Sequence, residues 1–287
     1  MPRLLSVGHV CHDRAPGGDV VGGSVTYGSL TAKRLGWDVA ILSSAGPDFD
    51  APRELPGVPV FLQPSAATTR FVNEYEADGT RHQTVTSRAD DIRFEALPEA
   101  WRAPDALLLG PLVGELSGVS ASAFEAECVG AIAQGYVRAI DGEGRVSAKG
   151  WERPERDLMG VHVLFLSQHD VPDADARARE FLSLVPIVAL TRGWRGLTLL
   201  TRDGVHDVPS LPRPEKDPTG AGDVFAAAFL VRYQETSDPL EAAAFAACAA
   251  SCAVEGVGTT TLGDRAEVMR RMELRNTMIE GGEWEEE

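Results

Sequence analysis

The sequence predicts a doubly wound α/β sandwich with a small β element inserted near the N-terminal third. Near-continuous apolar runs, typical of buried parallel strands, recur from Ala106 onward, and helical stretches separate several of them. No internal repeat and no clear linker interrupts this alternation. We therefore expect a single domain over residues 1–275, followed by an acidic tail over residues 276–287.

The N-terminal third supplies the expected β element. Phe71–Ala77 and Thr80–Thr86 flank Asp78-Gly79, a dipeptide typical of tight hairpin turns. Both arms are rather polar, as expected for a sheet with one exposed face. The elements expected before this hairpin are a strand over Leu4–Val10, a helix that Gly22-Gly23 opens and that ends near Leu35, and a strand over Asp38–Ser43.

The rest of the chain supplies the expected sandwich. Its buried strands are predicted at Ala106–Leu109, Val137–Ile140, Val161–Leu166, Ile187–Leu190 and Leu197–Leu200. Its helices are predicted at Ala121–Gln134, Asp173–Leu184, Ala221–Tyr233, Pro239–Val254 and Asp264–Arg275.

Composition limits the function classes. The 287 residues are 44% hydrophobic and 24% charged, which indicates a globular chain, and the net charge of −16 argues against nucleic acid as a partner. No apolar run approaches the roughly 20 residues that cross a bilayer, so no membrane partner is expected. The N-terminus meets His9 and Asp13 too early for a signal peptide, so we expect a cytoplasmic location.

The four cysteines give no sign of a metal centre. Cys248 and Cys252 lie four residues apart in an alanine-rich helical stretch, where small buried residues on one helix face are expected. His9, Cys11 and His12 suggest a metal at first sight. Strand alternation, however, places His12 on the opposite face from the other two.

The most informative segment is DPTGAGD, Asp217–Asp223. Two glycines leave backbone N–H groups unobstructed at the start of an apolar helix, where the helix dipole favours an anion. A carboxylate beside an anion site suits the proton transfer of a phosphoryl-transfer reaction, so Asp223 is a candidate base. The plainer alternative is an ordinary helix capped by Thr219 or Asp217.

Two other nucleotide-binding motifs are missing. The sequence contains no G-x-x-x-x-G-K-[ST], which excludes a Walker-type phosphate loop. No G-x-G-x-x-G follows the first strand, which weakens the hypothesis of a nicotinamide-dependent oxidoreductase.

The chain resembles the PfkB family of carbohydrate kinases. DPTGAGDVFAAAFL is similar to the family's second signature, and GGSVTYGSLTAKRLGWDVAILSSAG to its first. The resemblance covers the whole chain in order and implies a three-layer α/β/α ribokinase-like sandwich with a small β lid. It implies an ATP-dependent kinase that uses Mg²⁺ and acts on a hydroxyl group.

The resemblance also assigns site residues. It implies that Asp223 is the base and that the amides of Gly220, Ala221 and Gly222 stabilise charge on the transferred phosphoryl group. Asp13 and Gly22-Gly23 match the positions that hold the acceptor. The residues implied to bind ATP are Thr191, Arg192, Gly193 and Gly196 in one turn, Thr219 in the second signature, and Gly256 and Gly258 in a later loop.

Each of these assignments has a plainer alternative. Asp13 would otherwise be a surface turn carboxylate, Thr191–Gly196 a β-turn with solvated arginines, and Gly256–Gly258 a helix C-cap. Asp141–Arg145, which follows a predicted strand, is either a border of the cleft or a plain glycine turn.

Two positions depart from the family pattern. Tyr27 stands where sugar kinases of the family often carry Asn, so we expect a different acceptor pocket that includes Tyr27. The family's Asn-x-x-Glu motif, which helps to organise magnesium, appears here as Ser167–Asp170. Asp170 keeps a carboxylate that suits Mg²⁺ binding through water, although a helix cap or surface acid is the alternative.

The sequence thus predicts a sugar or cyclitol kinase. The opening GHVCHD and Tyr27 are most similar to the myo-inositol kinase branch, and a neutral polyol needs hydroxyl acceptors such as Asp13. The alternatives are a nucleoside kinase of the same fold and a non-catalytic sugar-binding or regulatory protein. The oligomeric state is left open, a homodimer included.

Overall fold

A nine-stranded sheet forms the centre of the computed structural model, which describes residues 1–15, 18–75 and 81–281. Neighbouring strands from β13 to β5 are parallel, whereas β14 and β15 are antiparallel at one edge. The order is β15 (Gly204–Val208), β14 (Leu197–Thr201), β13 (Ile187–Thr191), β12 (Val163–Ser167), β9 (Cys128–Ile132), β8 (Ala106–Leu109), β1 (Arg3–Val7), β4 (Asp38–Ala45) and β5 (Val60–Pro64).

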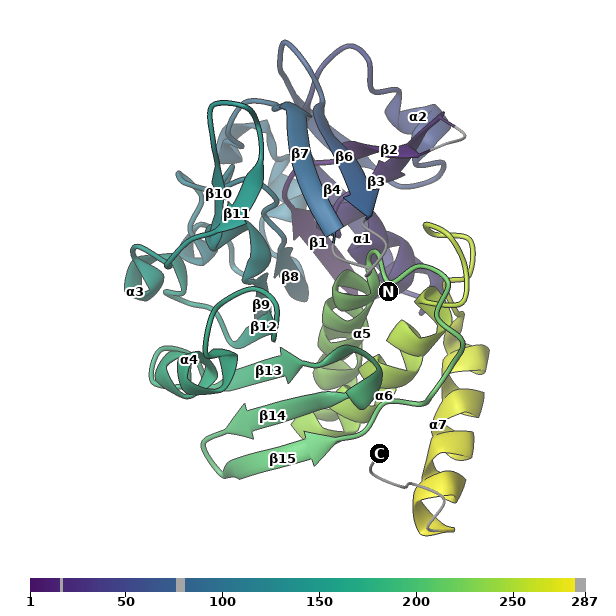
Figure 1. Ribbon diagram of the computed structural model, residues 1–287. Helices are drawn as coiled ribbons and strands as arrows, with labels where there is room; N and C mark the ends of the chain where they lie inside the picture. Colours follow the sequence, from purple (N-terminus) through teal and green to yellow (C-terminus); the bar gives the residue numbers. More distant parts are fainter. Residues whose placement is uncertain (16–17, 76–80, 282–287) are drawn as a thin grey trace.

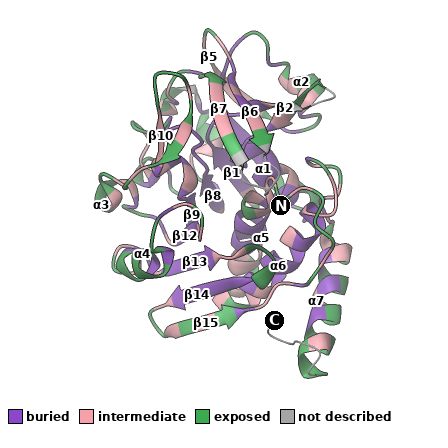
Figure 2. Cartoon of the chain, viewed as in Figure 1, coloured by how far each residue is buried: buried purple, intermediate pink, exposed green. Residues whose placement is uncertain are grey.

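Successive side chains of these strands enter two separate cores, because strand residues alternate between the faces of a sheet. On β1, Leu4 lies in the core under the long helices and Leu5 in the core on the opposite face. Both cores are buried (Figure 2). The three-layer arrangement predicted from the sequence is therefore present.

Four helices cover the first face: α1 (Ser24–Arg34), α5 (Ala221–Thr236), α6 (Pro239–Ala253) and α7 (Arg265–Glu280) (Figure 1). Residues 224–231 of α5 are all buried, since α5 packs against both the sheet and α6. The shorter α4 (Ala174–Phe181) packs on the other face. Two single-turn helices are α2 (Ala51–Glu54) and α3 (Pro154–Asp157).

A second sheet forms a lid beside the central sheet, at the top of Figure 1. Its strands, in spatial order, are β3 (Gly18–Gly22), β2 (Cys11–Ala15), β6 (Thr69–Tyr75) and β7 (Arg81–Ser87). The predicted hairpin is confirmed as the antiparallel pair β6–β7, whereas its Asp78-Gly79 turn lies outside the described residues. The sequence did not reveal β2 and β3.

A small hairpin supports the lid from one side. It consists of β10 (Arg138–Ile140) and β11 (Val146–Ala148), and Val85 N on β7 donates to Gly144 O in its turn at 2.8 Å. The strand predicted at 137–140 is therefore present, but it belongs to this hairpin and not to the central sheet. The Asp141–Arg145 segment is the glycine turn of the hairpin.

Three other predictions of local structure were wrong. The helix expected over 121–134 is absent: a short 3₁₀ turn is followed by β9, because CVGAI is an apolar, partly β-branched run that fits between two parallel strands. The strand at Leu197–Leu200 is antiparallel to its neighbours, because a short turn over residues 192–196 reverses the chain after β13 and a two-residue turn reverses it again before β15. The first strand ends at Val7, and the residues after it lead into the lid.

The helix predictions near the C-terminus are closer. The four bounds of α5 and α6 fall within three residues of those expected, and Cys248 and Cys252 are buried on α6. Helix α7 continues to Glu280, five residues beyond the expected end. The division into a domain and a tail remains a prediction. Within the described residues, every helix is too short or too polar to span a bilayer.

Candidate active site

Helix α5 begins in a turn that only glycine fits. Gly220, the residue before the first helical position, has a φ of 80°, a conformation in which a side chain is strained. A Cβ atom at this position would also lie 2.4 Å from the ring of Tyr27 on α1. Tyr27 therefore sets the shape of the turn by packing against its backbone.

The same turn leaves donors open at the start of α5. The N–H of Ala221 donates to Pro218 O at 3.2 Å, so one of the three predicted amides is engaged within the turn. Among the described residues, no acceptor takes the N–H of Gly222 or Asp223, and no side chain caps the helix. Exposed N–H groups and the positive end of the helix dipole together favour an anion here.

Asp223 lies in the first turn of α5 and faces a cavity. The pKa of Asp223 is raised to about 6: burial raises it most, the Ser24 side chain and the Arg138 guanidinium lower it, and the negative charges of Asp170 and Asp13 raise it. A carboxyl with this pKa is ionised at neutral pH and is a stronger proton acceptor than an exposed aspartate. These properties suit a general base.

Asp13 forms the opposite wall of the cavity from lid strand β2. The diglycine Gly22-Gly23 packs closely against Asp13 and His9. A Cβ on Gly22 would lie 2.1 Å from Asp13 Oδ2, and one on Gly23, whose φ is 95°, would lie 2.6 Å from His9 O. The two glycines thus let the backbone approach the Asp13 carboxylate and start α1 directly behind it.

The cavity between these walls has a volume of about 70 Å³. It brings together Asp13, Gly23, Tyr27, Thr219, Gly220 and Asp223 of the predicted site residues. Sequence reasoning missed the other residues of its lining that bear on ligand binding: Cys11, Phe71, Asn73, Gln83, Leu112, Gln134 and Arg138.

The sequence could have revealed two of these missed residues, Asn73 and Gln83. Asn73 and Gln83 stand on the two arms of the predicted hairpin and are cross-strand partners, so polar residues at matched positions pointed to one face. The side chain of Asn73 donates from Nδ2 to Asp13 Oδ1 at 3.4 Å, while its buried Oδ1 finds no hydrogen-bond partner in the described part of the chain. An unsatisfied acceptor beside the cavity suits a ligand hydroxyl.

Arg138 had no such signal, because it begins a segment that looked like a buried strand. It lines the cavity from the first residue of β10, and its Nη1 donates to Leu112 O at 3.5 Å. It is the cation that lowers the pKa of Asp223. Arg138 therefore adds a positive charge to a cavity that otherwise carries two carboxylates.

Cys11 is a wall of the cavity and not a reactive nucleophile. Burial raises the pKa of its thiol well above the usual value, and the carboxylates of Asp13 and Asp223 raise it further. The thiol therefore stays protonated. It packs with Phe71, Leu112 and Val113 in a small apolar cluster under the lid.

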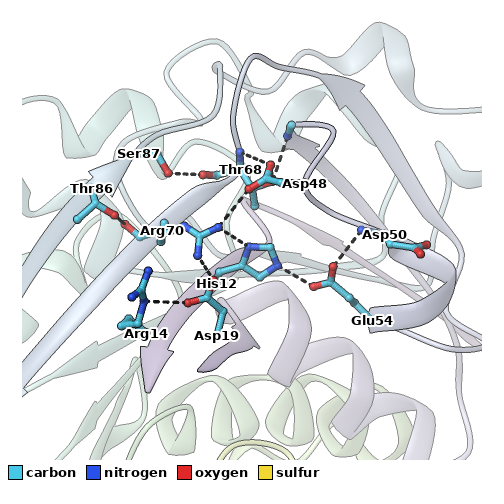
Figure 3. A network of polar contacts seen from close by, with 11 residues as sticks. His12, Arg14, Asp19, Asp48, Asp50, Glu54, Thr68, Arg70, Thr86 and Ser87 are labelled. Atoms are coloured by element: carbon cyan, nitrogen blue, oxygen red, sulfur yellow. Dashed lines mark hydrogen bonds and ion pairs between the residues drawn. The ribbon is translucent and has the colours of Figure 1, made fainter. Parts of the chain in front are cut away.

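A polar network fixes the other face of β2 (Figure 3). Because neighbouring strand residues point to opposite faces, His12 points away from Asp13, and its Nε2 lies 2.7 Å from Glu54 Oε2 on α2. Arg70 Nη2 lies 3.5 Å from His12 Nδ1 and 3.2 Å from Asp48 Oδ2. These contacts tie the strand that carries Asp13 to the main body.

The first predicted ATP-binding segment, Thr191–Gly196, lies at the end of β13. Thr191 ends β13 beside the end of β12, where its carbonyl accepts from Gln168 N at 3.0 Å. Gly193 has a φ of 62° and open space around it. A Cβ on Gly196 would lie 2.2 Å from Val208 O, so this glycine is required for packing against the end of β15.

Arg192 is engaged in contacts of its own. Its Nη2 pairs with Asp175 Oδ1 at 2.5 Å, and its Nε lies 3.2 Å from Thr198 Oγ1. In this arrangement the guanidinium is directed to α4. The prediction that Arg192 contacts ATP therefore requires this ion pair to open, and it remains a prediction.

The two other predicted ATP-binding segments are joined by Asp217. Its Oδ1 accepts from Thr219 N at 2.9 Å, and its Oδ2 lies 3.3 Å from Gly258 N. The loop of Gly256 and Gly258 is thereby fixed beside the start of α5. A Cβ on Gly256 would collide with Thr261 at 2.3 Å, which gives this glycine a structural role as well.

No group of three or more potential metal ligands gathers among the described residues. Asp170 instead closes its own turn, accepting from Ser167 N at 2.7 Å through Oδ2. Its negative charge helps to raise the pKa of Asp223, although Asp170 is not among the residues that line the cavity. This arrangement fits a magnesium ion that keeps most of its waters and is held largely by a phosphate ligand.

Comparisons with known proteins agree with this geometry. Residues 160–265, which contain Asp170, Thr191 and the start of α5, match the family model of pfkB family carbohydrate kinases. A nucleoside kinase of Methanothermobacter thermautotrophicus is 36% identical over 86 residues, a segment that covers 30% of this chain and 28% of that protein. The chain thus matches less than a third of the length of that relative.

Solved structures share the fold over nearly the whole chain. A sulfate complex of a pyrophosphate-dependent kinase in the ribokinase family has a TM-score of 0.77 and 23% identity, covering 93% of this chain and 99% of the other. A pyrophosphate-dependent ribokinase-family kinase complexed with a pyrophosphate analogue and myo-inositol has a TM-score of 0.75, 24% identity and the same coverage. The predicted PfkB resemblance and the ribokinase-like fold are confirmed.

Proposed function

We propose that this chain is an ATP-dependent kinase that transfers the γ-phosphoryl group to a hydroxyl of a small sugar or cyclitol, with Asp223 as the base. The observation that carries the proposal is the position of Asp223. Its carboxyl, with a pKa of about 6, faces a partly open polar cavity and stands in the first turn of a helix that leaves the N–H groups of Gly222 and Asp223 open. This places a proton acceptor beside an anion site, as phosphoryl transfer requires.

The proposed reaction uses the carboxylate of Asp223 and the open N–H groups at the start of α5. The acceptor hydroxyl gives its proton to Asp223 as its oxygen bonds to the γ-phosphorus, and the bond from the γ-phosphorus to ADP breaks. The N–H groups of Gly222 and Asp223 stabilise the charge on the transferred group. Mg²⁺, when bound, would neutralise part of the phosphate charge, and Asp170 is the residue that would hold it through water.

The lining of the cavity supports a neutral polyol as the acceptor. Asp13 accepts from two neighbouring hydroxyls, Asn73 Oδ1 accepts from another, and Arg138 donates. These acceptors and this donor match the ring of hydroxyls of a cyclitol, and myo-inositol is the acceptor we propose.

A nucleoside is the second candidate acceptor. The local similarity to a nucleoside kinase favours it. The cavity is partly open, so its volume does not exclude a base beside the sugar. The acceptor screen distinguishes the two candidates.

An acceptor screen tests the proposal. Purified protein would be given myo-inositol, ribose, fructose or adenosine with Mg²⁺ and either ATP or pyrophosphate, and the phosphorylated product measured. We expect turnover of myo-inositol with ATP. If only adenosine is phosphorylated, the acceptor is a nucleoside and not myo-inositol. If only pyrophosphate supports turnover, the donor is pyrophosphate and not ATP. No donor consumption with any acceptor would favour a non-catalytic sugar-binding protein. A cytoplasmic location is part of the proposal.

A further inference from the structure

A buried carboxylate outside the cavity holds two of its walls. Glu115 follows β8 in the loop after Gly110 and is fully buried. Its Oε1 accepts from His9 N and Leu112 N, both at 2.9 Å, and its Oε2 accepts from Leu112 N at 3.0 Å and Val113 N at 2.8 Å. The side chain thus binds only backbone N–H groups in these contacts.

This arrangement suits an ionised carboxylate. Among the described residues, no lysine or arginine forms an ion pair with Glu115, so its charge is stabilised by the peptide dipoles that surround it. A carboxylate oxygen accepts several hydrogen bonds, and each of the three N–H groups would be unsatisfied without it. The residue therefore fixes the conformation of the backbone that carries these donors.

The backbone that Glu115 fixes leads directly to the cavity. On one side, His9 precedes Cys11 and Asp13, and its carbonyl lies under Gly23. On the other side, the side chain of Leu112 lines the cavity, and its carbonyl accepts from Arg138 Nη1. Glu115 thereby connects the segment before Asp13 with the Leu112 carbonyl that binds Arg138, here called the Arg138 anchor.

We infer that Glu115 is a positioning residue of the proposed kinase, which holds the Arg138 anchor and the start of β2 at the distances that the acceptor requires. The inference rests on the proposed function. Glu115 does not border the cavity itself, so its effect on the acceptor passes through Leu112 and His9.

The first test is Glu115→Gln, which keeps the size of the side chain but replaces one acceptor oxygen with an amide that faces N–H donors. We expect the KM for the acceptor found in the screen to rise at least tenfold and the KM for the donor to change less than twofold. The matched control is Glu125→Gln, an exposed carboxylate elsewhere on the chain, which should leave both constants unchanged.

The second test is a double-mutant cycle with Arg138→Met. If Glu115 acts through the Arg138 anchor, the combined variant should raise the acceptor KM less than the product of the two single effects. Should Glu115→Gln not fold, Glu115→Asp provides the same test, since it keeps the charge but withdraws it by one methylene.

The outcomes separate the inference from the function. A Glu115→Gln protein with lower thermal stability but an unchanged acceptor KM would show a merely structural residue and overturn the inference alone. If the increase of the acceptor KM in the double variant equals the product of the two single increases, Glu115 does not act through Arg138. A wild-type protein that turns over no acceptor with either donor would overturn the proposed function, and the inference with it.

Discussion

Helices α5 and α6 pack against each other but begin in opposite ways. The first turn of α6 is closed by its own residues: Asp238 accepts from Leu240 N at 2.9 Å and Glu241 N at 3.0 Å, and Pro239 has no N–H to satisfy. Helix α5 has no side-chain cap, and Gly220 enters it in a left-handed conformation.

The difference separates a structural helix start from a ligand-binding one. Both helices have the same dipole, but only α5 leaves N–H groups for an external anion and places a carboxyl of raised pKa beside them. Sequence signals of this kind are easily confused, since an Asp-Pro pair lies before α5 and another spans the start of α6. The four predictions below test whether the two starts have these different roles.

The largest effect is expected for Asp223→Asn. Removal of the base should lower kcat by about 10²–10⁴ while the donor still binds, as measured by steady-state kinetics and donor titration. Folding should not suffer. Because burial raises the carboxyl pKa above its unfolded value, the ionised form reduces stability as pH rises from about 4 through 6. The variant should therefore have a Tm at pH 8 no lower than that of the wild type, and near-normal turnover would refute the role of Asp223.

The turn before α5 is the next most sensitive point. Gly220→Ala would place a Cβ 2.4 Å from the Tyr27 ring at a φ of 80°, so we expect at least a tenfold loss of kcat together with a lower Tm. Gly118→Ala is the matched control, because no atom lies within 4 Å of its Cβ position and its φ is not positive. Equal behaviour of the two variants would mean that the turn tolerates a side chain.

The pH dependence tests the environment of Asp223. A base with a pKa of about 6 loses its proton-accepting form as pH falls below that value. We expect kcat/KM to be level above about pH 7 and to fall about tenfold per pH unit well below 6. An activity that stays level down to pH 4.5 would indicate a different base or an unshifted carboxyl.

The smallest effect is expected at the other helix. Asp238→Ala removes the cap of α6 and should cost about 1 kcal/mol of folding free energy, a fall in Tm of roughly 2–4 °C, with kcat unchanged. Asp203→Ala, in the exposed turn between β14 and β15, provides a control in which no helix loses a cap. A large loss of activity in Asp238→Ala would contradict the purely structural role of the start of α6.

The sequence by itself predicted the layers, the long C-terminal helices and the turn at Asp223. Each of these depends on residues close together in the chain: apolar runs for strands, glycines for the turn, and alanine-rich stretches for helices. Asp13, Tyr27 and the diglycine were found by resemblance, and the structure places all but Gly22 in the lining of one cavity, with Gly22 against Asp13.

Only the tertiary structure decided the rest of the cavity. Strand β2 (CHDRA) is polar and lies between β3 and β6, and its partner β6 is more than 50 residues away in the chain, so no local pattern revealed the β3–β2 pair. The contact of Arg138 with Leu112 O and that of Glu115 with His9 N join segments more than 20 residues apart in the chain, and local patterns do not reveal such contacts. Long-range packing determines which side chains share a cavity, whereas short-range chemistry determines which turns and helices form.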